Sequence, residues 1–111
     1  MDFMIEKEYD YIPVFGGNSK SENPAVFHLK ALNTIDRERC MTERMVDSTI
    51  ERIINESETV RRGVKSIDNL KLSGKEIKTA TDLINAEGLN MLLSEVAGVL
   101  ITKVAKPDLK N

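Results

Sequence analysis

Few residues of this chain have the type and spacing that catalysis requires. His28 is the only histidine in the sequence. As a general base it would need an orienting carboxylate and a nucleophile nearby, and the surrounding sequence suggests neither. We therefore expect His28 to be a surface histidine on one face of a strand.

Cys40 is the only cysteine, so an internal disulfide and a Cys/His zinc site within one chain are both excluded. A reactive thiolate favours cationic neighbours, and Arg37, Arg39 and Arg44 lie close to it in sequence. A small buried hydrophobic side chain is nevertheless the expected role of Cys40.

Acidic residues recur at spacings near four and seven in the middle of the chain, at Glu43, Asp47, Glu51 and Glu58. On a helix they would gather along one flank and could bind a cation. Their Arg and Lys neighbours make ordinary ion pairs the expected arrangement. No Gly-x-Ser-x-Gly, Walker or His-Glu-x-x-His motif is present. We expect a protein that is not an enzyme, without cofactor, metal or small-molecule substrate.

The composition is that of one small domain, expected to span residues 1–111. The net charge is −2, with acidic and basic residues well mixed, so the basic stripe typical of nucleic-acid binding is missing. The N-terminal residues do not resemble a signal peptide, and no run of about 18 apolar residues indicates a membrane span. A cytoplasmic protein without nucleic-acid or membrane partners is expected.

A long central helix over Met45–Ile67 is the predicted spine of the fold, because apolar residues recur there at steps of three and four. Period-two alternation predicts a strand within residues 3–15 and a second within 25–32, with a short hairpin over 70–77. Asn33 or Thr34, and later Thr79 or Thr81, are expected to cap helices. The predicted fold class is α+β, mainly α-helical, with the helices packed on a small N-terminal β-hairpin or sheet.

Residues 16–24 (GGNSKSENP) have loop composition and are expected to be mobile, and residues 106–111 are expected to form a loose tail. The last helix is predicted over Leu89–Val104. Its apolar residues cover more than half of its circumference, so it is either central in the domain or presents one side to a partner. The candidate partner-binding surface consists of Leu89, Leu92, Leu93, Val96, Val99 and Leu100.

Three stretches together resemble a known family. The first is Tyr11–Asn18 (YIPVFGGN), and the second is Val26–Leu32 (VFHLKAL), which runs into the charged helix start Thr34–Arg39. In the third, Gly74–Ile77 leads through Asp82-Leu83-Ile84 and Gly88-Leu89 to Leu93–Val96 (LSEV), and the sequence closes on Leu109-Lys110-Asn111. This arrangement, which covers most of the chain, resembles the small tail assembly chaperones of long-tailed (siphovirus-like) bacteriophages and prophages.

The resemblance implies an oligomeric, mostly helical binding protein in the host bacterial cytoplasm. Its expected partners are the tape measure protein, which it would coat, and the tail tube protein, which it would recruit during tail morphogenesis. Many members are made in two lengths by ribosomal frameshifting, and Lys110-Asn111 suits a slippery AAA-AAC codon pair. The family supplies no catalytic residues to transfer.

Two other classes stay open at this point. A virion structural subunit, such as a tail tube, completion or connector protein, would share the small size and balanced charge. A small non-enzymatic regulator is the other, although a DNA-binding form should show a basic recognition helix, and none is evident.

Overall fold

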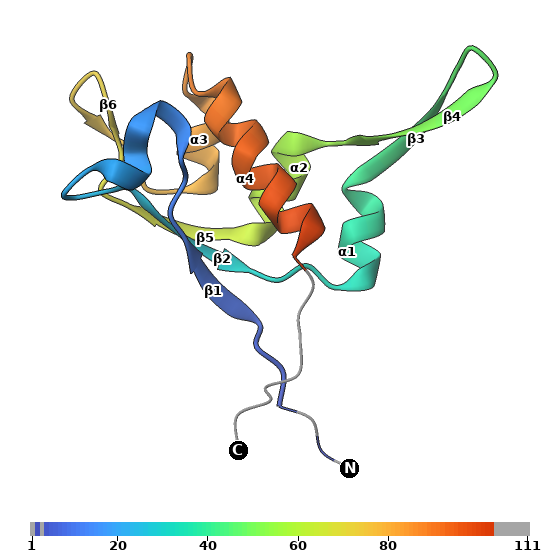
Figure 1. Cartoon of the computed structure of the whole chain (residues 1–111), viewed down its shortest axis with the longest axis horizontal. Coiled ribbons are helices and arrows are strands. Elements are labelled where there is room, and N and C mark those ends of the chain that lie inside the picture. The colour runs from blue at the N-terminus through green and yellow to red at the C-terminus, as the bar shows by residue number, and fades with distance from the viewer. Residues whose placement is uncertain (1, 3, 104–111) are drawn as a thin grey trace.

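The chain folds into an α+β domain with three small antiparallel sheets, as a computed structural model that describes residues 2 and 4–103 shows (Figure 1). The tail predicted at 106–111 lies outside the described residues. In chain order the elements are β1 (Glu8–Tyr11), η1 (Phe15–Lys20), β2 (Val26–Lys30), α1 (Thr34–Arg39), β3 (Met41–Val46), β4 (Thr49–Ile54), α2 (Glu56–Gly63), β5 (Val64–Asp68), β6 (Lys71–Leu72), β7 (Lys75–Glu76), α3 (Ala80–Asn85) and α4 (Asn90–Thr102).

The main sheet has the strand order β1-β2-β5, with both pairings antiparallel. The alternation predicted for β2 is confirmed, because Phe27 and Leu29 are fully buried whereas Lys30 is exposed. Opposite side chains of a strand leave opposite faces of its sheet, so one face of this sheet joins the core and the other meets solvent.

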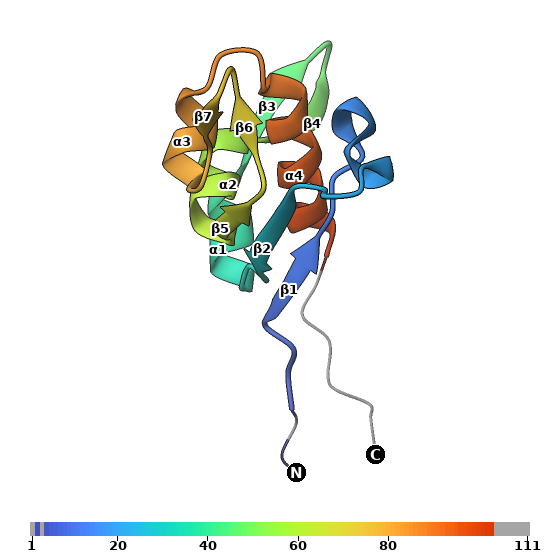
Figure 2. The ribbon, with the colours of Figure 1, turned by 90° about the vertical axis from the view of Figure 1, so that its left-hand side faces the viewer.

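Helices α2, α3 and α4 lie next to the main sheet (Figure 2) and supply much of the rest of the core. Leu32, Cys40, Ile77 and Leu89 of the connecting segments complete it. The C-terminal helix α4 packs against α2, η1 and β4, so its wide apolar surface is used on several sides. At the closest approach of α2 and α4, a Cβ atom added to Gly63 would lie 2.4 Å from a methyl carbon of Leu100. None of the helices in the described part of the chain is long and apolar enough to cross a membrane.

Several local predictions are confirmed by hydrogen bonds. The Asn33 side chain accepts from the backbone N–H of Asp36 at the start of α1. Thr79 and Asp82 form a reciprocal capping box at the start of α3. The hairpin expected over 70–77 is present as β6–β7, and its turn residues Ser73 and Gly74 both have positive φ.

The segment 16–24, expected to be a loop, contains most of the short 3-10 helix η1, which begins at Phe15. The Asn18 side chain holds the segment in place. Its amide group donates to the carbonyl oxygens of Pro13 and Ala25, and its side-chain oxygen accepts from the N–H of Ala25.

The predicted helix over Met45–Ile67 is wrong, and with it the expectation of a mainly α-helical fold. This stretch forms the end of β3, all of β4, the short helix α2 and most of β5. The chain reverses at Asp47-Ser48, and Asn55 caps α2 by accepting from the N–H of Glu58. The apolar residues recur at the three- and four-residue steps of a helix, which led to the wrong prediction. The β-branched residues around Ile50 favour a strand, and the polar turn at Asp47-Ser48 interrupts the pattern.

Candidate protein-binding arm

A two-stranded arm projects from the body of the domain, with both strands extending away from α1 and α2 (Figure 1). It consists of β3 and β4, which pair with each other and with no other strand in the described part of the chain. At its base the backbone N–H of Asn55 donates to the carbonyl oxygen of Cys40 over 2.7 Å. Met41, Ile53 and Ile54 are half-buried there, so the body anchors only this end of the arm.

Beyond its base the arm packs against no other element among the residues that the structure describes. Residues 42–45 and 47–52 are all exposed. Two large apolar side chains lie directly opposite each other near the tip, where Met45 is 68% and Ile50 is 63% exposed. An isolated two-stranded hairpin is only marginally stable in water, so a partner that covers this arm would stabilise it.

Charged pairs separate the apolar positions along the arm. Glu43 lies 3.3 Å from Arg52, and Glu51 lies 3.7 Å from Arg44. The register places Glu43 opposite Arg52 and Arg44 opposite Glu51, so these contacts bridge the two strands. The acidic row expected on one helix flank is therefore divided: Glu43 and Glu51 lie on the arm, Asp47 lies in its turn and Glu58 lies on α2. Ion pairs form as predicted at Glu43, Glu51 and Glu58.

The turn at the tip places two non-glycine residues in the left-handed backbone region. Asp47 has φ 49° and Ser48 has φ 66°. A two-residue turn of this kind suits the twist of a hairpin, but it is usually built from Asn-Gly. Glycine adopts this backbone without steric cost and aspartate tolerates it, whereas serine does not, so the turn is strained mainly at Ser48.

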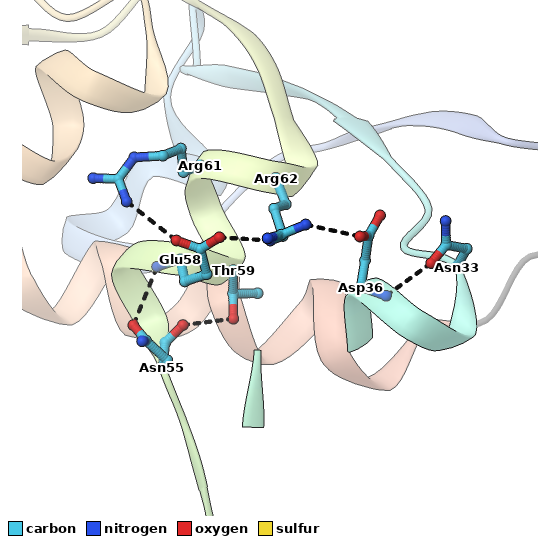
Figure 3. A network of polar contacts seen from close by, with 7 residues as sticks. All are labelled: Asn33, Asp36, Asn55, Glu58, Thr59, Arg61 and Arg62. Atoms are coloured by element: carbon cyan, nitrogen blue, oxygen red, sulfur yellow. Dashed lines mark hydrogen bonds and ion pairs between the residues drawn. The ribbon is translucent and has the colours of Figure 1, made fainter. Parts of the chain in front are cut away.

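A polar network next to the arm's base joins α1 to α2 (Figure 3). Arg62 donates to Asp36 over 2.8 Å and to Glu58 over 2.6 Å, and Arg61 adds a longer contact to Glu58. The Arg62 guanidinium is the main cause of a lowered pKa at Glu58. The network fixes the helix that precedes β3 against the helix that follows β4.

The partner surface predicted on the last helix is not an open surface in this fold. Four of its six residues belong to the core, because α4 is packed on several sides: Leu89, Leu92, Val96 and Leu100. Leu93 and Val99 are half-buried. Met91, which the prediction left out, is the exposed apolar residue of this helix, at 75%.

His28 does have orienting carboxylates, contrary to the sequence-based expectation. On the solvent face of the main sheet its Nδ1 lies 2.7 Å from Asp10 of β1 and its Nε2 lies 2.6 Å from Asp68 of β5. Hydrogen bonds to Asp68 and then to Asp10 raise the pKa of His28. The expected placement on a strand face is confirmed, but these partners are 18 and 40 positions away in sequence, so only the strand pairing reveals them.

The surroundings of His28 do not form a catalytic arrangement. Ser66 lies opposite it on β5 and lines the same cavity of about 240 Å³. Both ring nitrogens are already bonded to carboxylates, so neither is placed to accept a proton from the serine hydroxyl. Within residues 2 and 4–103 no group of three or more His, Cys, Asp and Glu residues could hold a metal ion.

Glu95 of α4 anchors the segment after β1 to the core. Its carboxylate accepts from the Tyr11 hydroxyl over 2.5 Å and from the backbone N–H groups of Val14 and Phe15 over 2.8 and 3.0 Å. Burial and the bond to Glu95 raise the pKa of Tyr11 to about 12. Cys40 is fully buried, in agreement with the expected hydrophobic role.

Comparisons with protein-family models, curated proteins and solved structures gave no match for this chain.

Proposed function

We propose that this protein is a non-enzymatic tail assembly chaperone of a long-tailed phage or prophage. In this proposal it binds the tape measure protein in the host cytoplasm and recruits tail tube subunits. Support comes from the sequence resemblance and from one structural observation, the β3–β4 arm that leaves Met45 and Ile50 exposed. A protein that must hold a client before assembly needs such an uncovered surface.

The arm suits a helical, aggregation-prone client. Its apolar pair can contact the apolar side of a partner helix, and methionine adapts to varied partner shapes. The flanking Glu43–Arg52 and Arg44–Glu51 pairs place charges on both strands, and the charges within each pair cancel. Binding would then depend on burial of apolar surface and tolerate different client sequences.

Co-expression with the tape measure protein of the same phage tests the proposal. We expect the chaperone to keep the client soluble and to co-purify with it. The double variant Met45→Asp/Ile50→Asp should stay folded, because neither side chain is buried, and should lose the client. Met91→Asp is the matched control, since it places the same charge at an exposed site on α4. Retained binding by the arm variant would remove the arm from the proposal, and no binding by the wild type would refute it.

A virion structural subunit is the second candidate, because a projecting arm also suits subunits that interlock in a particle. The two differ in the fate of the protein. A chaperone leaves during assembly, whereas a tube, completion or connector subunit remains. Quantitative mass spectrometry of purified virions therefore decides between them, with the chain absent for a chaperone and present in stoichiometric amount for a subunit.

A further inference from the structure

We propose that two copies of this chain exchange halves through the arm and form a symmetric domain-swapped dimer. The turn Asp47-Ser48 opens, and the part of each copy that follows the turn folds onto the part of the other copy that precedes it. The proposal rests on the turn, on the arm and on the way the core divides. It is independent of the function proposed above.

The strained turn gives the exchange a driving force. Asp47 and Ser48 both hold left-handed backbone in the monomer, with φ values of 49° and 66°. In the exchanged dimer these residues become a hinge in extended backbone, which every L-residue adopts readily. Short hinge loops under strain are the usual sites of domain swapping.

The division of the core makes the exchange cooperative. The main sheet draws β1 and β2 from the first half and β5 from the second. Arg62 of the second half bonds Asp36 of the first, and Glu95 bonds Tyr11 in the same way. Neither half has its own complete core, so each half of one copy needs the complementary half of the same or of another copy.

Every contact of the arm is kept in the dimer. In the monomer Glu43 pairs with Arg52 and Arg44 with Glu51, always between β3 and β4. The same pairs form when β4 comes from the second copy, so the charges remain complementary. Only the turn geometry changes, and it changes toward lower strain.

The projecting arm also keeps the two bodies apart. In the dimer, residues 41–54 of each copy form one continuous strand, and the two strands pair antiparallel. At about 3.3 Å per residue, this two-stranded ribbon is about 45 Å long. The two bodies attach at opposite ends of this ribbon and point away from each other, because the arm projects from the body (Figure 1). The apolar pairs Met45–Ile50 remain exposed along the ribbon.

A cysteine pair across the arm reports the exchange directly. In the variant Met45→Cys/Ile50→Cys, refolded at high protein concentration and then oxidised with glutathione disulfide, the two cysteines lie opposite each other. We expect covalent dimers on non-reducing gels, because residue 45 of one copy faces residue 50 of the other. Wild type, whose Cys40 is buried, and the single variant Met45→Cys are the controls. Disulfides formed only within single chains, at every concentration, would overturn the proposal.

Changes to the turn supply a second, independent test by light scattering after size-exclusion chromatography. Ser48→Gly relieves the left-handed strain and should lower the dimer-to-monomer ratio on the order of tenfold. Deletion of Asp47 and Ser48 makes Val46 and Thr49 the only residues available for the turn. Both are β-branched and disfavour left-handed backbone, so the shortened protein should shift toward the dimer. A dimer-to-monomer ratio that stays unchanged in Ser48→Gly and in the deletion variant would contradict the proposal.

Discussion

Single polar side chains join strands and helices that are distant in sequence. His28 links β1 and β5 through Asp10 and Asp68, and Glu95 links α4 to the backbone at Val14 and Phe15. Both groups carry charge-assisted hydrogen bonds, which are stronger than neutral ones. Both partners of His28 are carboxylates, so its hydrogen bonds stabilise the fold most when the imidazole is protonated.

His28 should make stability depend on pH in a defined direction. Its pKa is raised in the folded state, so its contribution is fully present below the unfolded value of about 6.5 and is lost as pH rises through the folded value. We expect His28→Gln to lower the thermal midpoint by about 2–4 °C at about pH 5.5 and by less at about pH 9. Circular dichroism melts at both pH values check this, and equal losses would show that the imidazolium charge contributes nothing.

At the scale of elements, the packing of α2 on α4 depends on one glycine. Gly63→Ala would bring its Cβ within 2.4 Å of Leu100, a side chain that is fully buried. Leu100 would have to shift within the packed core, so we expect a loss of about 1–3 kcal/mol in the free energy of unfolding.

Gly98→Ala is the matched control, because Gly98 lies inside α4 with nothing within 4 Å of its added Cβ. This variant should gain about 0.5–1 kcal/mol from helix propensity and reduced unfolded-state entropy. Urea titrations of both variants give the comparison. A Gly63→Ala protein as stable as Gly98→Ala would mean that the two helices are not closely packed there.

The elements that could be predicted from the sequence are those with one buried face or with capping side chains close by in the sequence. β2 alternates because one face is buried, and Thr79 with Asp82 marks α3 through its own side chains. The arm lacks such a signal, since both of its faces are exposed and no period-two pattern is required. Its residues therefore also matched a helix. The β-branched Thr49, Ile50, Ile53 and Ile54 around a polar turn were the signal that could have found it.

The candidate surface on α4 is a related case, because most of its residues are buried in the monomer. A helix that is apolar on most sides predicts burial or an interface equally well, and tertiary packing decides between them. Here α2, η1 and β4 pack on different sides of α4, while Met91 stays exposed. The short η1 segment gives no helical signal of its own in the sequence.

At the scale of the whole molecule, the described chain consists of a body with one continuous hydrophobic core and an arm that has no core of its own. The core cluster runs through β2, α2, β5, α3 and α4, whereas residues 42–45 and 47–52 are exposed. Local opening costs little where few apolar contacts are lost, and global unfolding is needed where many are lost. The two parts should therefore differ in the free energy at which their backbone hydrogen bonds open.

Amide hydrogen exchange measures that difference. We expect amides of the arm, such as those of Arg44 and Glu51, to exchange at least about a hundredfold faster than those of Leu29 and Val96, because opening the arm leaves the core intact. Binding of the client to the arm should slow exchange in the arm alone. Arm amides as protected as core amides in the isolated monomer would mean that the arm is covered by the body, which would remove the basis for its role as a binding surface.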